Sequence, residues 1–330
     1  MKRLPRGLPA GLLIGLRVGL VGGFGALAGA CGFFHAPAPS STVQPRLAAA
    51  SRTGDSPEGS LALHRRSLLA AVNADRAAAG AQPVALDRLA TDVAQAHAEA
   101  MARGDYLSHL DAQGRTPYER MAAAGGMAHV RENVFRWQER WDVRPPTWDP
   151  WRRFDVRQAE RHFMDSPGHR ATILDPRRTH VGLGIAVDPA RQAIYVVQEF
   201  LADWAELGAP RQASRGTVVT VAGRMRAGHL RPLLAVVRRE EARATAGSGR
   251  QPPRGAYADG AGEATVIPPW TFRWEPDGRF TFPVAAGNRP ARLYGVLYVA
   301  PARVVTGALA QRSAASAAGW PGAAFVLTIR

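Results

Sequence analysis

The 330-residue chain contains one cysteine, Cys31, and one lysine, Lys2. A single thiol cannot close an internal disulfide, so no internal disulfide stabilises the chain. An uninterrupted apolar run of the roughly 20 residues that a membrane-spanning helix needs is also lacking, because Arg17 divides the first apolar stretch. What is present, 46% hydrophobic and 8% aromatic residues, is enough to form globular cores, and the length allows two domains.

The N-terminus has the features of an export signal. Lys2, Arg3 and Arg6 form a positive segment, and a short apolar segment from Val18 to Leu27 follows. Small residues come next, at positions 28–30. We therefore predict a signal peptide over residues 1–30, and an exported protein that does not bind nucleic acid.

Cys31 directly follows this segment and needs an explanation in an exported protein. Residues 27–31 resemble a bacterial lipobox, although Leu27 lies one position earlier than usual. The resemblance implies lipidation of Cys31 and a membrane anchor, so that the protein is lipid-anchored in the cell envelope. The alternative is ordinary cleavage near Ala30, which gives a secreted protein with an incidental thiol.

Apolar periodicity divides the rest of the chain. Residues 31–60 are rich in Ala, Pro, Ser and Thr and are predicted to form a disordered linker. Helical spacing of apolar residues follows over 61–79 and 89–101, and Thr116 and Glu119 form a capping box for a third helix. Another capping pattern begins at Asp155, and two strands are expected over 181–187 and 193–200. Helices around a small sheet indicate an α/β domain over 61–205.

The chain changes character after a linker predicted over 206–215. Short β-type runs separated by Pro and Gly indicate a small all-β, sandwich-like domain over 216–330. From Arg211 onward the chain has 17 arginines and 6 acidic residues, an excess of +11 out of a total formal charge of +15. This excess has two interpretations. It is a solvated basic surface of an arginine-rich composition, or it attracts an anionic envelope polymer or lipid headgroups.

Several ordered motifs resemble the CAP superfamily, also called the SCP-like or cysteine-rich secretory and pathogenesis-related protein family. They cover about 140 residues, from the helix that contains Asn73 and Arg76 to the strand that begins near His180. Tyr106-Leu-Ser108-His109 resembles the first histidine motif of the family, and Arg131-Glu132-Asn133 its Gly-Glu-Asn motif. Residues 163–174, which include His169, resemble its second histidine motif. The resemblance implies an α-β-α sandwich with a large cleft.

The family's cleft residues correspond to His109, Glu132 and His169. Two imidazoles and a carboxylate are a suitable ligand set for Zn²⁺ or another divalent cation. Glu132 has two possible roles, as a ligand or as a carboxylate that orients an imidazole. The family's second acidic residue corresponds to Ser166, so the set is incomplete, and only Glu160 or Asp165 lies near enough in sequence to replace it.

Other polar residues near these motifs have structural interpretations. His97 lies on an apolar helical face and is expected to be a hydrogen-bonded core histidine. Asn133 is expected to anchor backbone. Ser108 and Ser166 lack the sequence context of a nucleophile, and no catalytic residue is assigned.

Residues 135–154 form a connection that is long for the family. It places tryptophans among arginines, at Trp137, Trp141, Trp148 and Trp151. One interpretation is a locally folded loop whose tryptophans pack beneath it. The other is an amphipathic lid that contacts lipid or glycan, since indole suits apolar and polar boundaries.

Two functions of different class follow. The first and preferred one is a non-catalytic binding module for a lipid or another cell-envelope ligand. The alternative is a metal-dependent hydrolase or peptidase, in which a bound ion would activate water. A structural envelope protein with a vestigial cleft is also compatible with the composition.

Overall fold

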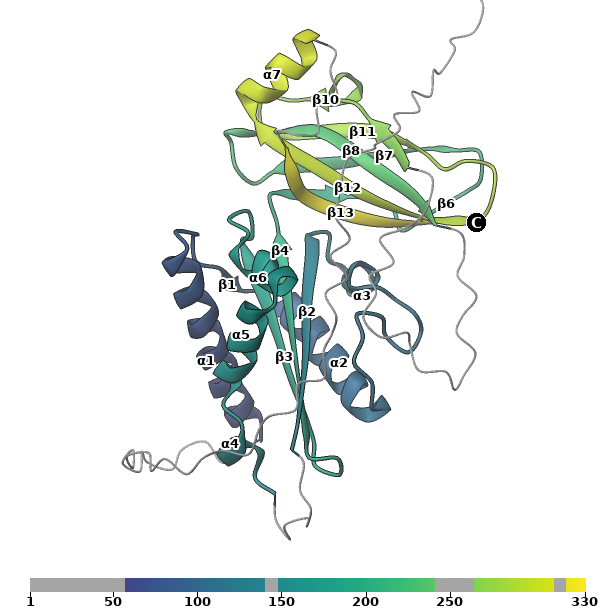
Figure 1. Cartoon of the computed structure of the whole chain (residues 1–330). Helices are drawn as coiled ribbons and strands as arrows, with labels where there is room; N and C mark the ends of the chain where they lie inside the picture. Colours follow the sequence, from purple (N-terminus) through teal and green to yellow (C-terminus); the bar gives the residue numbers. More distant parts are fainter. Residues whose placement is uncertain (1–56, 140–147, 241–263, 312–318) are drawn as a thin grey trace, which may run out of the picture.

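The computed structural model describes residues 57–139, 148–240, 264–311 and 319–330. The predicted signal peptide, Cys31 and most of the predicted linker over 31–60 lie outside the described residues. Two bodies follow one another along the chain, first helices around a sheet and then two packed sheets (Figure 1). Within the described ranges, no helix is both long enough and apolar enough to cross a membrane.

A four-stranded sheet forms the centre of the first domain. Its order is β1 (Ala85–Leu86), β3 (His180–Asp188), β4 (Ala193–Ala202) and β2 (His129–Gln138). β1 is parallel to β3, and the other pairs are antiparallel. The expected strands over 181–187 and 193–200 are confirmed as β3 and β4. β2 was not predicted, and it lies at the edge of the sheet beside β4.

Helices cover both faces of this sheet, as Figure 1 shows. Alternate side chains of a strand point to opposite faces. Val181, Leu183 and Ile185 of β3 pack with α1 (Pro57–Ala78), α5 (Val156–Asp165) and α6 (Pro167–Leu174). On the other face, Ala186 and Val197 pack against α2 (Arg88–Gly104). The expected α-β-α sandwich is therefore confirmed.

Two glycines of β3 allow α2 to lie directly on the sheet. A Cβ atom at Gly182 would lie 2.1 Å from the carbonyl carbon of Ala90, and one at Gly184 would lie 2.2 Å from the carbonyl oxygen of Ala94. Backbone cannot move away as a flexible side chain can, so any larger residue would push α2 off the sheet. This contact fixes the position of the segment that carries His109 after α2.

The α3 helix (Pro117–Ala123) lies on the same side as α2 and has the capping box predicted from Thr116 and Glu119. Thr116 N donates to Glu119 Oε2 over 2.7 Å, and Glu119 N donates to Thr116 Oγ1 over 3.4 Å. The short helix α4 (Pro150–Arg153) precedes α5. Because a helix as short as α3 is not stable in isolation, its tertiary contacts stabilise it.

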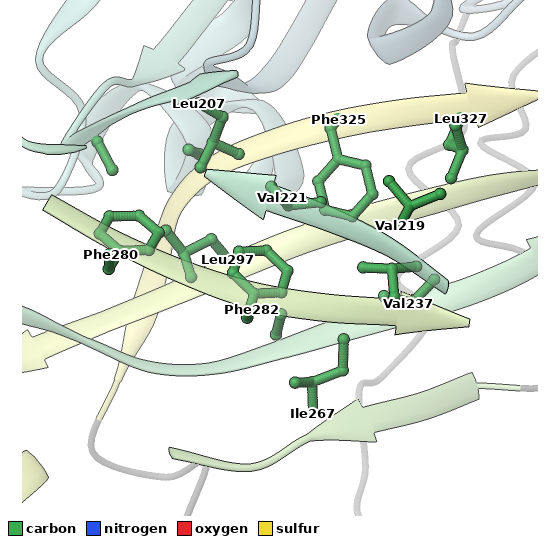
Figure 2. Close-up of a cluster of buried hydrophobic side chains, with 14 of the residues drawn as sticks. Leu207, Val219, Val221, Val237, Ile267, Phe280, Phe282, Leu297, Phe325 and Leu327 are labelled. Carbon is green, nitrogen blue, oxygen red and sulfur yellow. The ribbon is translucent and has the colours of Figure 1, made fainter. Parts of the chain in front are cut away.

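The second domain consists of two sheets that pack face to face. One has the order β10 (Arg273–Trp274), β11 (Arg279–Ala285), β7 (Val218–Met225) and β5 (Ala205–Gly208). The other has the order β6 (Gln212–Ala213), β13 (Trp320–Ile329), β12 (Ala291–Pro301), β8 (Leu230–Glu240) and β9 (Ala264–Ile267). Figure 2 shows side chains from both sheets, such as Phe282 and Phe325, meeting in one apolar core. A helix, α7 (Ala302–Gln311), and a 3-10 turn, η1 (Pro269–Thr271), complete the domain.

The predicted linker over 206–215 differs from the structure. β5 and β6 occupy half of it, and each belongs to a sheet of the second domain. β5 pairs with β7 and β6 pairs with β13, which are partners later in the sequence. The second domain therefore begins almost immediately after β4.

Candidate functional site

The three predicted site residues lie on or beside the edge strand β2. Glu132 is on β2, His109 lies in the segment between α2 and α3, and His169 is in the first turn of α6. Neighbouring residues of a strand point to opposite faces. Glu132 contacts the α2–α3 side of the sheet, and Asn133 contacts the α5–α6 side. The site therefore has two halves, one on each face of β2.

The first half is a buried ion pair with an imidazole. His109 Nδ1 lies 2.8 Å from Glu132 Oε1, and Arg120 Nη2 donates to Glu132 Oε2. Arg120 Nη1 also donates to the carbonyl oxygen of His109 over 2.8 Å. Glu132 is 3% exposed, His109 6% and Arg120 7%. Both oxygens of Glu132 thus have protein partners, and Arg120 links them to the backbone of His109.

A second carboxyl group lies directly opposite Glu132. Glu199 of β4 is its cross-strand partner and is completely buried. Arg120 Nη2 lies 3.4 Å from Glu199 Oε1, so one guanidinium group serves both acids. Two adjacent buried carboxylates repel each other, and one of them then retains its proton.

The electrostatics of this half follow from burial. Burial raises the pKa of Glu199 well above its ordinary range, and the charge of Glu132 raises it further. Burial raises the pKa of Glu132 to about 7, while Arg120 opposes that change. Burial and then the charge of Arg120 lower the pKa of His109 to about 4. At neutral pH the imidazole of His109 is uncharged and donates from Nδ1 to Glu132, and the raised pKa of Glu199 favours its protonated form.

His97 belongs to the same buried group of residues. It is 1% exposed, its Nε2 lies 2.9 Å from the carbonyl oxygen of Ser108, and the same atom is 3.9 Å from Glu132 Oε2. Burial lowers its pKa well below the ordinary value. The contact with Ser108 agrees with its expected role as a hydrogen-bonded core histidine. The Ser108 hydroxyl accepts a bond from Leu110 N over 3.0 Å, which is a structural contact.

The second half, on the α5–α6 side, is a chain of amide and carboxyl groups. Asn133 Nδ2 donates to Gln198 Oε1 over 3.0 Å and lies 3.4 Å from the carbonyl oxygen of His169. Gln198 Nε2 in turn donates to Glu160 Oε2 over 2.5 Å. Asn133 thus anchors the backbone of α6, as its sequence context predicted.

Glu160 is the acidic residue of this second half of the site. It is 1% exposed, and burial raises its pKa to about 8, so it is protonated at neutral pH. Asp165 is exposed, and Ser166 occupies the N-cap position of α6 without a side-chain capping bond. Of the two acids considered as replacements for the missing one, Glu160 alone lies in the buried network, where it contacts Gln198 and not a histidine side chain.

His169 is half-buried, and its ring packs edge-on against Phe163 at 5.2 Å between centroids. Burial lowers its pKa to about 4, with a smaller contribution from His109. Both rings are neutral at pH 7, the state in which imidazole binds a metal.

A three-ligand metal site does not fit this arrangement. Among the described residues, no group of three His, Cys, Asp or Glu side chains could hold one ion. The oxygens of Glu132 bond His109 and Arg120, so this carboxylate orients an imidazole, the second of its two predicted roles. Only His109 and His169 would be ligands for an ion at this place, and we derive no chemical step through a metal.

Three residues of the site were not identified from the sequence. Arg120, Gln198 and Glu199 hold the network together, yet they belong to no histidine motif. One signal was available, because Gln198 and Glu199 interrupt the otherwise apolar run of β4, every residue of which is buried. Adjacent polar residues inside a buried strand require partners.

The tryptophan-rich connection packs largely on its own domain. Trp137, Trp148 and Trp151 contact the apolar core beneath them, and Trp148 Nε1 donates to Glu139 Oε2 over 2.8 Å. These contacts agree with the interpretation as a locally folded loop. Trp141 lies outside the described residues.

Trp151 also lines a groove whose lining does not include His109 or His169. The groove lies between α1, α2 and β3 and has a volume of about 500 Å³. Its apolar wall includes Leu61, Ile185 and Val187. Its charged lining consists of two ion pairs, Arg103 with Glu99 and Arg191 with Asp188. The ring of Trp151 stacks on His64 of α1, with centroids 3.7 Å apart. The volume lies within the range of ordinary small-molecule sites.

Comparison with known proteins identifies the first domain. Residues 69–200 match the model of the CAP family, described as the cysteine-rich secretory protein family. The uncharacterized protein YkwD of Bacillus subtilis is 25% identical over 141 residues, which are 42% of this chain and 49% of that protein. The chain therefore spans about half the length of this curated relative.

Two solved structures are also similar. An extracellular protein with an SCP domain from Bacillus anthracis has 20% identity and a TM-score of 0.36, over 45% of this chain and 44% of that one. An outer surface protein of Borrelia burgdorferi has 14% identity and a TM-score of 0.34, over 42% of this chain and 92% of that one.

Proposed function

Because residues 69–200 belong to the cysteine-rich secretory protein (CAP) family, we propose that this chain is an exported binding module that holds an envelope lipid. The lipid occupies the groove beside Trp151, and the His109–Glu132–His169 region keeps the domain in shape. Cys31 anchors the module to the membrane, in keeping with its lipobox-like context. The groove is the feature of the molecule that supports this binding function.

The groove carries the proposal. Its wall is formed by aliphatic side chains and an indole, which suit an acyl chain because burying apolar surface contributes about 25 cal/mol per Å². Arg103 beside this wall has a side chain that is 71% exposed, and it forms an ion pair with Glu99 of the same groove, so the polar part of an amphiphile would meet both charges. An apolar wall with ion-paired polar side chains at its edge matches an amphiphile with an apolar chain better than it matches a polar glycan.

The histidine region supports a non-catalytic role. A general base must accept a proton from water or substrate, and a catalytic zinc normally has three protein ligands. Glu132 already accepts from His109 and Arg120, and it is 3% exposed. The metal-dependent hydrolase is therefore the less favoured function, and no single contact of this region supports it.

A fluorescent fatty acid titrated into the purified protein tests the proposal. We expect saturable binding, and we expect Trp151→Ala to raise Kd by about tenfold, since loss of an indole contact costs about 1.4 kcal/mol. Trp270→Ala is the matched control, because Trp270 is 48% exposed on the second domain and remote from the groove. His109→Ala should leave Kd unchanged.

Three results would contradict this function. Wild-type protein could fail to bind the fatty acid, or Trp151→Ala could bind it as wild type does. Binding of a soluble cell-wall glycan in place of the fatty acid would replace lipid by glycan as the ligand. Hydrolysis of a peptide or ester substrate that His109→Ala and His169→Ala abolish would establish the alternative.

A further inference from the structure

The second domain contacts the first through the helix α3. Tyr118 of α3 packs on Tyr294 of β12, with ring centroids 4.5 Å apart. Beside it, Ala324 N of β13 donates to the carbonyl oxygen of Met127 over 2.7 Å. Met127 also packs against the apolar core of the second domain. These contacts place the second domain against the α3 side of the CAP domain.

An ion pair crosses the boundary at the same helix. Arg292 Nη1 of β12 donates to Glu119 Oε1, while Glu119 Oε2 accepts from Thr116 N over 2.7 Å in the capping box. The Glu119 side chain is 9% exposed and that of Arg292 is 47% exposed. One carboxylate therefore joins the start of α3 to the second domain.

The next residue of α3 belongs to the histidine site. Arg120 donates to the carbonyl oxygens of His109 and Arg115 over 2.8 and 3.1 Å, and it donates to Glu132. α3 has seven residues, so a shift at Glu119 is transmitted directly to Arg120. Glu119 faces the second domain and Arg120 faces the buried carboxyl pair.

We infer that Arg292 of the second domain is a positioning residue for the histidine site of the CAP domain. By holding Glu119 it fixes α3, and through α3 it fixes Arg120 against Glu132 and His109. The second domain then has a role that its own sequence does not suggest, which is to complete the CAP domain. This inference does not depend on lipid binding.

The hydrogen-bonded ring proton of His109 gives a specific readout. In the full chain, we expect NMR to detect a protected Nδ1 proton on His109, and Arg292→Ala to shift or broaden it. Amide hydrogen exchange in α3 should accelerate roughly five- to tenfold, with exchange in α2 unchanged.

Matched variants separate positioning from general stability. Arg224→Ala removes an ion pair within the second domain whose side chain is 56% exposed, and it should leave the His109 signal unchanged. Glu119→Gln retains the capping box but removes the charge that Arg292 meets, so it should reproduce Arg292→Ala. Arg292→Lys should restore the wild-type signal, and it also tests the inference if Arg292→Ala does not fold.

The inference is overturned if Arg292→Ala and Glu119→Gln both leave the His109 proton and α3 exchange as in wild type. It is equally overturned if Arg224→Ala changes the His109 signal as much as Arg292→Ala does, because the effect would then be a general loss of stability.

Discussion

Replacing Glu160 by glutamine should make the protein more stable at alkaline pH. Glu160 is 1% exposed, and its Oε2 accepts from Gln198 while its Oε1 is buried without a hydrogen-bond partner among the described residues. Burial, and to a smaller extent the charge of Asp75, raises its pKa from 4.5 to about 8. Folding therefore favours the protonated acid, and ionisation of the folded protein is costly.

The sign and size follow from linkage. A group whose pKa is raised on folding contributes its stability below the unfolded value, here 4.5, and loses it as the pH rises through about 8. Each pKa unit corresponds to about 1.36 kcal/mol, so the full change between pH 4 and pH 9 is at most about 5 kcal/mol. Glutamine cannot ionise and keeps an oxygen that accepts from Gln198. The stability of Glu160→Gln relative to wild type should therefore rise by several kcal/mol over this interval.

Urea unfolding of both proteins from pH 4 to pH 9 measures this difference. Asp165→Asn on the same helix is the control, because the side chain of Asp165 is exposed whereas that of Glu160 is buried. Its difference from wild type should be constant with pH. A constant difference for Glu160→Gln as well would refute the claim that Glu160 is buried as a neutral acid.

Two further predictions concern packing and metal binding. Gly184→Ala should destabilise the protein by roughly 1–3 kcal/mol in urea unfolding, because the new Cβ would lie 2.2 Å from the carbonyl oxygen of Ala94. Gly168→Ala is the control and should cost little, because its new Cβ meets nothing within 4 Å. Equal urea midpoints for the two variants would contradict the direct contact between α2 and β3. Calorimetry should detect weak binding of Zn²⁺, with His109 and His169 as its protein ligands. His109→Ala and His169→Ala should each abolish this binding, whereas the control His180→Ala should retain it. Tight binding that survives in the double variant of His109 and His169 would show that the ion binds elsewhere.

Local patterns predicted the framework of the first domain well. The helices α1, α2, α3 and α5, the strands β3 and β4, and the capping box of α3 each depend on residues within one element, so periodicity and cap chemistry identify them. The short helices α4 and α6 were not predicted. β2 was missed because Arg131, Glu132 and Asn133 interrupt its apolar alternation. These three residues are polar in the middle of a strand because one faces solvent and the others contact the helices on opposite faces of the sheet. Those contacts are determined only once the sheet and helices have assembled.

The partners of the site residues could not be predicted in the same way. Glu199 opposes Glu132 because of the register between β2 and β4, and 67 residues separate them in the sequence. Arg120 reaches both acids from a short helix that contacts the second domain. Likewise, β5 and β6 are too short to be distinguished from a linker until β7 and β13 pair with them.

The charge balance of the histidine region gives its residues a structural role that does not require catalysis. Glu132 is the group that carries charge between His109, Arg120 and the protonated Glu199, so a single guanidinium compensates it. Removal of one partner from such a buried pair typically costs 3–5 kcal/mol, because the other charge is left uncompensated. Substitutions at Glu132 or Arg120 are therefore costly even if no substrate ever reaches them. The charge balance around Glu132 therefore accounts for the contacts of His109 and Arg120 without requiring chemistry in a cleft.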